Sequence, residues 1–255
     1  MGVPAVDKAV EVLRTLASSD DPMPLSRLAA QLALPKSSLH NVCTSLVEAG
    51  LLEKDEAGRY SLGMFVVELA RQRLGRMDVV GNFLKICGDL ALNEAIVLSV
   101  LNGPDVVYVA CVNADRPLGV RYQIGMRLPA AFTASGKAML ATRSDDMVRD
   151  LLGPAVDSLV HPGTRKSTDV LLDELHETRE RQYSIDDEET AIGMICLGAP
   201  VFQGRVGDCC GAIAISMVKS AVYPLPTHIA AEVRHLAKRL SESLGYTGGW
   251  PVPSR

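Results

Sequence analysis

Residues 24–63 read PLSRLAAQLALPKSSLHNVCTSLVEAGLLEKDEAGRYSLG. The first third of this stretch places apolar residues at helical spacing, and a second helical pattern runs from Lys36 to about Ala49. The connection Ala33-Leu34-Pro35 is short, and a proline fits the first turn of the following helix because its missing N–H has no partner to lose there. Two short helices joined by such a tight turn predict a helix-turn-helix.

The sequence on either side of these two helices completes the motif. Residues 5–18 form an amphipathic helical pattern, and Ser26 is placed to cap the helix that follows. On the other side, residues 51–55 and 59–62 are extended runs that flank a glycine-containing turn at 56–58, which predicts a hairpin. The order helix, helix, helix, hairpin predicts a winged helix-turn-helix.

Charge is distributed unevenly along the chain. The whole chain has a formal net charge of −4, yet residues 24–47 contain Arg27 and Lys36 and no acidic residue. A surface free of acids suits a phosphate backbone, but two cations are few, so we expect modest affinity per subunit and a need for dimerisation. The candidate DNA contacts are Arg27, Pro35, Lys36, Ser37, Ser38, His40, Asn41, Thr44, Lys54 and Arg59. The same pattern also fits a three-helix protein-interaction domain, in which these polar residues are ordinary solvated side chains.

Composition limits the class of protein. Hydrophobic residues make up 47% and charged residues 22% of the 255 residues, a balance typical of soluble globular proteins. The six cysteines show no regular framework, which indicates reduced thiols. The first residues lack the features of a secretion signal, and the apolar stretches are too short to span a membrane. We therefore expect a soluble, cytoplasmic protein with no membrane partner.

The remainder of the chain alternates helical and extended patterns. We expect helices at 64–76, 79–92, 133–141, 169–181 and 227–244, and strands at 95–101, 106–113, 183–186, 195–202 and 211–218. This irregular alternation predicts an α+β fold around an antiparallel sheet. The expected domains are a winged helix-turn-helix at 1–63, a helical linker at 64–76 and a larger domain at 77–255.

Several segments together resemble the IclR family of transcription regulators. In the N-terminal part they are AVDKAVEVL at 5–13, LSRLAAQLALPKSSLH at 25–40 and LVEAGLLEKDEAGRYSLG at 46–63. In the C-terminal part they are PDVVYVACV at 104–112, GMRLPAAFTASGKAML at 125–140, QYSIDDEE at 182–189 and AIGMICLGAPVF at 191–202. The resemblance implies a GAF-like effector-binding domain after the DNA-binding domain.

Two residues depart from the family pattern. Ala33 stands where the family usually has glycine, and an alanine forced to positive φ there is strained by about 1 kcal/mol. Asn41 stands where the family often has arginine, which removes a charged contact and favours adenine over guanine in base recognition.

The resemblance also implies an effector pocket. It places Asp186, Cys196 and Ser216 in contact with the effector, Ala214 where some members have serine, and Leu118 and Val120 in an apolar wall. The start of the helix at 133–141 would cradle a carboxylate or polar head, through Ala134 and Ser135 beside Phe132. We expect an effector with an apolar or aromatic body and one polar end. Two structural interpretations remain open: Thr133 or Ser135 simply caps the helix, and the acidic run 186–189 is a solvated turn.

Other chemistry is less well supported by the residues. Gly136-Lys137 lacks the remainder of a phosphate-binding loop, and the neighbouring Cys209 and Cys210 would point to opposite faces of a strand. We expect no catalytic residue, metal or cofactor, and therefore no enzyme. The alternative is an enzyme with Cys196 as nucleophile and His161 as base. Our favoured interpretation is a repressor that binds operator DNA, a small-molecule effector and itself, as a dimer or dimer of dimers.

Overall fold

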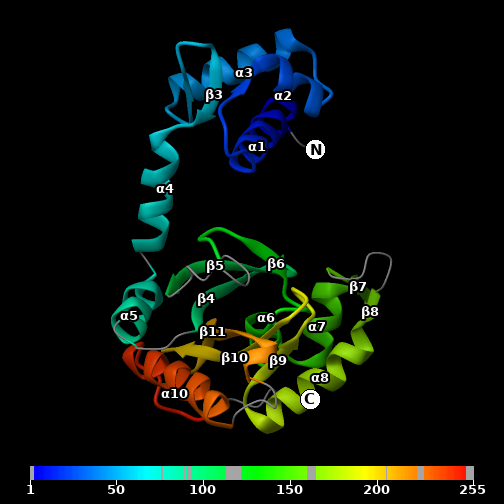
Figure 1. The fold of residues 1–255 in the computed structure, drawn as a ribbon, viewed down its shortest axis with the longest axis vertical. Coiled ribbons are helices and arrows are strands. Elements are labelled where there is room, and N and C mark those ends of the chain that lie inside the picture. Colours follow the sequence, from blue (N-terminus) through cyan, green and yellow to red (C-terminus); the bar gives the residue numbers. More distant parts are fainter. Residues whose placement is uncertain are drawn as a thin grey trace. The chain divides into compact units, whose positions relative to one another are not determined.

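The computed structural model describes residues 3–75, 77–88, 90, 94–112, 122–159, 165–204, 206–222 and 227–250. The chain divides into two compact units, Met1–Arg76 and Met77–Arg255 (Figure 1). Within the described residues, no helix is long and apolar enough to cross a membrane.

The first unit is a winged helix-turn-helix followed by one further helix. Its elements are α1 (Pro4–Ala17), β1 (Met23–Pro24), α2 (Leu25–Gln31), α3 (Lys36–Glu48), β2 (Leu52–Lys54), β3 (Arg59–Leu62) and α4 (Met64–Gly75). The strands form a small antiparallel sheet in the order β1-β3-β2. The core is made by Val12, Leu16, Met23, Leu28, Leu39, Cys43, Leu46, Leu52 and Tyr60, which draw all three helices and the hairpin together. The predicted winged helix-turn-helix is confirmed.

Local details of this unit differ from the sequence prediction. Ser26 does not cap α2, because the helix already begins at Leu25 and the capping position belongs to Pro24. Pro35 likewise takes the N-cap position of α3 and not its first turn. Both helices of the motif end in a left-handed residue: Ala33 has φ 51° after α2, and Gly50 has φ 71° after α3.

The second unit is built on a six-stranded antiparallel sheet in the order β6-β5-β4-β11-β10-β9. The strands are β4 (Ala95–Asn102), β5 (Asp105–Val112), β6 (Arg127–Pro129), β9 (Ser184–Asp187), β10 (Met194–Gln203) and β11 (Asp208–Val218), with a separate hairpin of β7 (Ala155–Asp157) and β8 (Arg165–Ser167). The helices are α5 (Asp78–Cys87), α6 (Ala134–Leu140), α7 (Asp145–Leu152), α8 (Thr168–Arg181), α9 (Lys219–Val222) and α10 (Thr227–Ser243). The expected α+β class is confirmed.

The central strands β10 and β11 are covered on both faces. On one face, α6 packs against Cys196, Ala212 and Ala214 in a core shared with α7 and α8. On the other face, α10 and α5 pack together and α10 lies along β10 (Figure 1). Both faces are apolar because a strand with helices on each side buries its odd and even residues alike.

Some elements of this unit were mispredicted. The helix expected at 79–92 ends at Cys87, with Gly88 in the C-cap position. The sequence prediction missed α7, whose N-cap Ser144 accepts a hydrogen bond from the Met147 N–H. It also missed the short strands β6, β7 and β8, each of three residues, which are too short for a two-residue periodicity to be detected.

Candidate functional site

The exposed face of α3 is polar and accessible. Ser37, His40, Asn41 and Thr44 are exposed, whereas Leu39, Cys43 and Leu46 on the opposite face are buried. Thr44 Oγ1 donates a hydrogen bond to the His40 carbonyl at 2.9 Å, so this hydroxyl is used by its own helix. His40 and Asn41 are the larger polar side chains that this face presents.

The cations of the first unit lie in different settings. Lys36 and Pro35 are exposed at the start of α3. Lys8 of α1, which sequence reasoning missed, reaches the same point, since its Nζ donates to Ser38 Oγ at 2.9 Å. A second cation therefore reaches the first turn of α3, where the positive end of the helix dipole already favours an anion.

The remaining candidate cations are partly engaged within the protein. Arg59 in the wing pairs with Asp55, with 2.7 Å between Nε and Oδ2. Hydrogen bonds from Arg59 hold the pKa of that carboxyl below its usual range. Lys54 lies over the Tyr60 ring, with Nζ 5.4 Å from the centroid. Arg27 is exposed on α2 and lines a shallow hollow of the same unit.

In the second unit, strand register places three predicted effector contacts in one row. Asp186 of β9 pairs with Cys196 of β10, and Cys196 pairs with Ser216 of β11. Facing residues on adjacent antiparallel strands lie on the same side of the sheet. Because Cys196 belongs to the core beneath α6, the whole row faces that helix.

This row is joined to two buried tyrosines. Tyr122 Oη donates to Ser216 Oγ at 2.9 Å and lies 3.7 Å from Cys196 Sγ. The Tyr122 ring packs against Tyr108 with 5.2 Å between centroids. The predicted residues Phe132, Ala134 and Ala214 belong to the same core cluster. Sequence reasoning missed both tyrosines as neighbours of this row. The predicted residues Leu118 and Val120 lie outside the described residues.

The start of α6 completes the site. Thr133 is the N-cap, and its Oγ1 accepts a hydrogen bond from the Gly136 N–H at 3.0 Å. Ser135 has a different status: its Oγ is buried, and its hydroxyl lies near that of Tyr108. Thr133 therefore performs the ordinary capping role, and Ser135 places a buried hydroxyl next to the Tyr108 side chain.

The acidic run at 186–189 is not a solvated turn. Asp186 is 2% exposed. Its carboxylate accepts hydrogen bonds from the Glu189 N–H at 2.9 Å, from the Thr190 N–H at 3.2 Å and from the Thr190 hydroxyl. Asp187 and Glu188 both pair with Lys219. Burial raises the pKa of Asp186, and the hydrogen bonds to its carboxylate oppose that rise only in part.

The same surroundings keep the Cys196 thiol protonated. Burial raises its pKa to about 12, and the charge of Asp186 adds to the effect. A cysteine nucleophile needs a lowered pKa, because the thiolate is the reactive form. The proposed base of the enzyme alternative, His161, lies outside the described residues. The setting of Cys196 therefore argues against nucleophilic catalysis.

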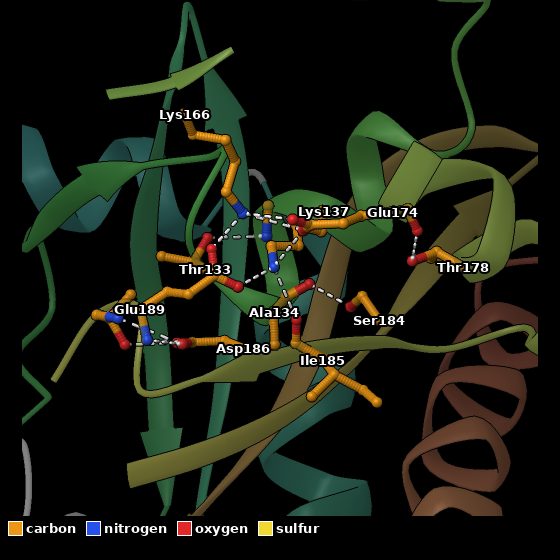
Figure 2. Close-up of polar contacts among 12 residues, drawn as sticks. Thr133, Ala134, Lys137, Lys166, Glu174, Thr178, Ser184, Ile185, Asp186 and Glu189 are labelled. Carbon is orange, nitrogen blue, oxygen red and sulfur yellow. Dashed lines mark hydrogen bonds and ion pairs between the residues drawn. The ribbon is translucent and has the colours of Figure 1, made fainter. Parts of the chain in front are cut away.

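A partly buried ionic cluster lies beside these residues of α6 and β9 (Figure 2). Lys137 of α6 is 2% exposed and pairs with Glu174 of α8 and with Glu189, and Lys166 of β8 pairs with the same two carboxylates. Lys137 Nζ also donates to the Ile185 carbonyl at 2.9 Å. Desolvation acts to lower the pKa of Lys137, but the two glutamates outweigh it and the pKa is raised.

Known proteins match the chain over nearly its whole length. The family described as "Bacterial transcriptional regulator IclR C-terminal" matches residues 72–242, and the IclR helix-turn-helix domain matches residues 5–56. The chain belongs to the IclR family. Among its relatives, the transcriptional regulator XynR of Escherichia coli is 26% identical over 250 residues, which cover 96% of this chain and 98% of XynR.

Solved structures agree with this membership. The repressor BlcR of Agobacterium tumefaciens is 32% identical, with a TM-score of 0.59 over 96% of this chain and 98% of BlcR. An IclR homologue from Microbacterium hydrocarbonoxydans, solved in complex with 4-hydroxybenzoate, is 21% identical, with a TM-score of 0.77 over 94% of this chain and 99% of that protein, and so shows the fold. The chain is a DNA-binding transcriptional regulator of the IclR family, and such regulators are not enzymes.

Proposed function

We propose that this regulator is a homodimeric repressor whose affinity for operator DNA changes when a small organic effector binds beneath α6. The observation that carries the proposal is the buried polar row Asp186–Cys196–Ser216 next to the buried Ser135 hydroxyl. Polar groups of this kind, set in an otherwise apolar core, are typical of a small-molecule site. The chain spans nearly the whole length of BlcR, which is named a repressor.

On the DNA side, we propose that α3 enters the major groove. Its exposed His40 and Asn41 would contact base edges, while Lys36 and Lys8 would lie against phosphates beside the helix N-terminus. Pro35, Ser37, Ser38 and Thr44 would line the same contact, with Arg27, Lys54 and Arg59 nearer its border. Because Arg59 is already paired with Asp55, its contribution to phosphate binding should be smaller than that of Lys36.

On the effector side, the described pocket residues favour a ligand with a flat apolar body. Phe132, Tyr108 and Ala214 supply apolar surface, and Ser135 and Ser216 supply polar ends. The complex of a family homologue with 4-hydroxybenzoate supports a ligand of this size and shape. We therefore favour a small aromatic or carboxylate effector. The domain limits 1–63, 64–76 and 77–255 remain our proposal for how these roles divide along the chain.

We propose that a second copy of the chain covers α4. This helix has no buried residue and exposes the large apolar side chains of Met64, Phe65, Val67 and Leu69. A twelve-residue helix without tertiary packing is only marginally stable in water. A symmetric pairing of two α4 helices would bury these side chains. It would also allow two winged helix-turn-helix domains to bind the two halves of a palindromic operator. A dimer of dimers is the extended form of the proposal.

An electrophoretic shift with the DNA upstream of the chain's own gene tests this function. We expect a sequence-specific shift that weakens with salt, because phosphate contacts release counterions. Lys36→Ala should weaken binding to specific and random DNA alike, whereas Asn41→Ala should mainly relax base preference, by about 1–3 kcal/mol. Equal losses on both DNAs for Asn41→Ala would refute its role in reading bases, and no specific shift for the unmodified protein would refute the function.

The effector is sought by thermal shift with small organic acids and phenols, since a ligand that binds the folded state raises apparent stability. A compound that stabilises the protein should also change the electrophoretic shift. Asp186→Ala should reduce the stabilisation, while Asp187→Ala, next to it but paired with Lys219 outside the pocket, should leave it intact. An unchanged response in Asp186→Ala would show that the compound binds elsewhere.

A further inference from the structure

A second cavity lies on the α10 side of the sheet, away from the residues beneath α6. It has a volume of about 500 Å³ and is bounded by β10, α10 and residues 246–250. We call it the C-terminal groove. Its floor is fixed by Phe202 and Ser241: the Phe202 N–H donates to Ser241 Oγ at 3.0 Å, and both residues are buried. The volume is that of an ordinary small-molecule pocket.

The walls of the C-terminal groove are aromatic. Phe202 contacts Tyr246 and Trp250, with ring centroids 5.3 and 6.4 Å apart. Tyr246 is held in place by its hydroxyl, which donates to the Gly249 carbonyl at 2.6 Å. Aromatic walls in tilted and edge-on arrangements favour a flat apolar ligand.

One donor in this wall has no acceptor. Trp250 Nε1 is buried, and none of the residues that the structure describes accepts a hydrogen bond from it. A buried indole N–H usually finds a partner, because losing its water without replacement costs free energy. Trp250 therefore offers a hydrogen bond to a ligand in the groove.

The rim of the groove is cationic. Arg234, His235 and Lys238 line it from α10, and the lining contains no aspartate or glutamate, although the chain as a whole has a net charge of −4. Arg234 uses its Nε for the Ala230 carbonyl of its own helix at 3.2 Å, and no ion pair to Arg234 occurs within the described residues. Within the part of the chain that the structure describes, the ion pair of Lys238 is a long one, 3.9 Å from its Nζ to Glu242 Oε1.

We propose that the C-terminal groove is a second ligand site, for an organic anion with a flat apolar body. The aromatic walls would hold the body, and the carboxylate would lie between the Arg234 and Lys238 side chains and accept from Trp250 Nε1. The two sites share β10 but use different residues of it, Cys196 beneath α6 and Ala199, Pro200 and Phe202 in the groove, so the two ligands need not compete. It is independent of the proposed effector.

The chain itself supplies the reporter, because Trp250 is its single tryptophan. The full-length protein is titrated with 3-phenylpropionate, with its neutral amide and with the cationic 3-phenylpropylamine, while Trp250 emission is excited selectively. We expect saturable changes in Trp250 emission, with affinity decreasing from the carboxylate to the amide to the amine. Isothermal titration calorimetry supplies an independent affinity.

Charge variants on one helix test the location. The double variant Arg234→Gln/Lys238→Gln should lose about tenfold in affinity for 3-phenylpropionate and little for the amide, because each exposed ion pair contributes roughly a factor of two to five. Arg239→Gln is the matched control, since Arg239 is an exposed cation of α10 that does not line the groove. It should bind like the unmodified protein.

Three results would overturn the proposal. The first is equal affinity for the carboxylate and the amide. The second is an equal loss of affinity in the double variant and in Arg239→Gln, or no loss in either. The third is Trp250 emission that does not change with any of the three probes but does change with protein concentration. That result would mean that a second copy of the chain occupies the groove.

Discussion

Ala33 holds a left-handed backbone conformation in the turn between α2 and α3, with φ 51° and an exposed side chain. The Leu34 N–H donates to the Ala29 carbonyl at 3.1 Å, the hydrogen bond that closes a Schellman motif. Gly50 forms the same motif after α3, where the Leu51 N–H donates to the Leu46 carbonyl at 2.9 Å. Only the first of the two turns has a side chain in the strained position, so Ala33→Gly should stabilise the first unit.

The magnitude follows from two opposing terms. Left-handed φ costs an alanine about 1–2 kcal/mol, which glycine avoids. Glycine also gives the unfolded chain more freedom, which removes about 0.4–1 kcal/mol of that gain. Because Ala33 is exposed, no buried methyl group is lost. The expected net stabilisation is about 0.5–1 kcal/mol.

Ala30→Gly is the matched control. Ala30 is also exposed and lies three residues earlier, inside α2, where glycine costs about 1 kcal/mol. Hydrogen exchange of the full-length protein reports the first unit locally, through peptides that cover α2 and α3. Exchange should be about two- to fivefold slower in Ala33→Gly and about fivefold faster in Ala30→Gly. Faster exchange in both variants would refute the strain argument, since the same substitution would then act only through chain entropy.

Further predictions concern the second unit. Lys137→Met should destabilise the second unit by about 3 kcal/mol, because it removes the buried cation that pairs with Glu174 and Glu189. The control Lys85→Met, at an exposed position, should change stability by less than about 0.5 kcal/mol. Thermal unfolding of the two variants measures the difference. Burial acts to raise the pKa of Glu174, but Lys137 and Lys166 outweigh it and hold that pKa below its usual range. The stabilisation of the folded state by the Glu174 carboxylate is therefore complete above about pH 4.3, the pKa of a glutamate in the unfolded chain, and is lost as the pH falls through the lower pKa of the folded state. The stability difference between Glu174→Gln and the unmodified protein should therefore shrink at acid pH, and a constant difference would contradict the pairing. Burial raises the pKa of the Cys196 thiol to about 12, so iodoacetamide should alkylate it much more slowly in the folded than in the unfolded protein; equal rates, measured by mass spectrometry, would show that Cys196 is open to solvent.

The winged helix-turn-helix could be predicted because its information is local. The apolar spacing in α2 and α3, the short turn between them and the hairpin glycine all lie within residues 24–63. Even the strain at Ala33 followed from one departure in one turn. The strand β1 was missed for the opposite reason, because it has two residues and is defined by its pairing with the distant Tyr60 and Arg59.

The ionic cluster could not be predicted, because its members come from four separate segments. Lys137 stands alone among apolar residues of α6, and that unusual charge is the one signal in the sequence. Its partners Glu174 and Glu189 lie on α8 and beyond β9, and nothing in their local sequence marks them as ligands of a buried lysine. The periodicity of apolar residues in a segment predicts a helix, whereas the contacts between helices depend on how the whole unit packs.

The row Asp186–Cys196–Ser216 shows how strongly strand register determines which side chains lie together. Asp186, Cys196 and Ser216 share one face only because β9, β10 and β11 pair in this register; a slip of one residue would turn each of these side chains to the other face of the sheet. Two contacts near the row hold it. Ser184 of β9 donates to the Ala134 carbonyl at the start of α6, and a Cβ at Gly198 of β10 would lie 2.5 Å from that same oxygen. The Ala134 carbonyl can therefore approach β10 this closely only at a glycine, and Gly198 lies on the same face of β10 as Cys196. The residue types of the row can be recognised in the sequence. Its assembly beneath α6 depends on Gly198, because this glycine has no Cβ to meet the Ala134 carbonyl.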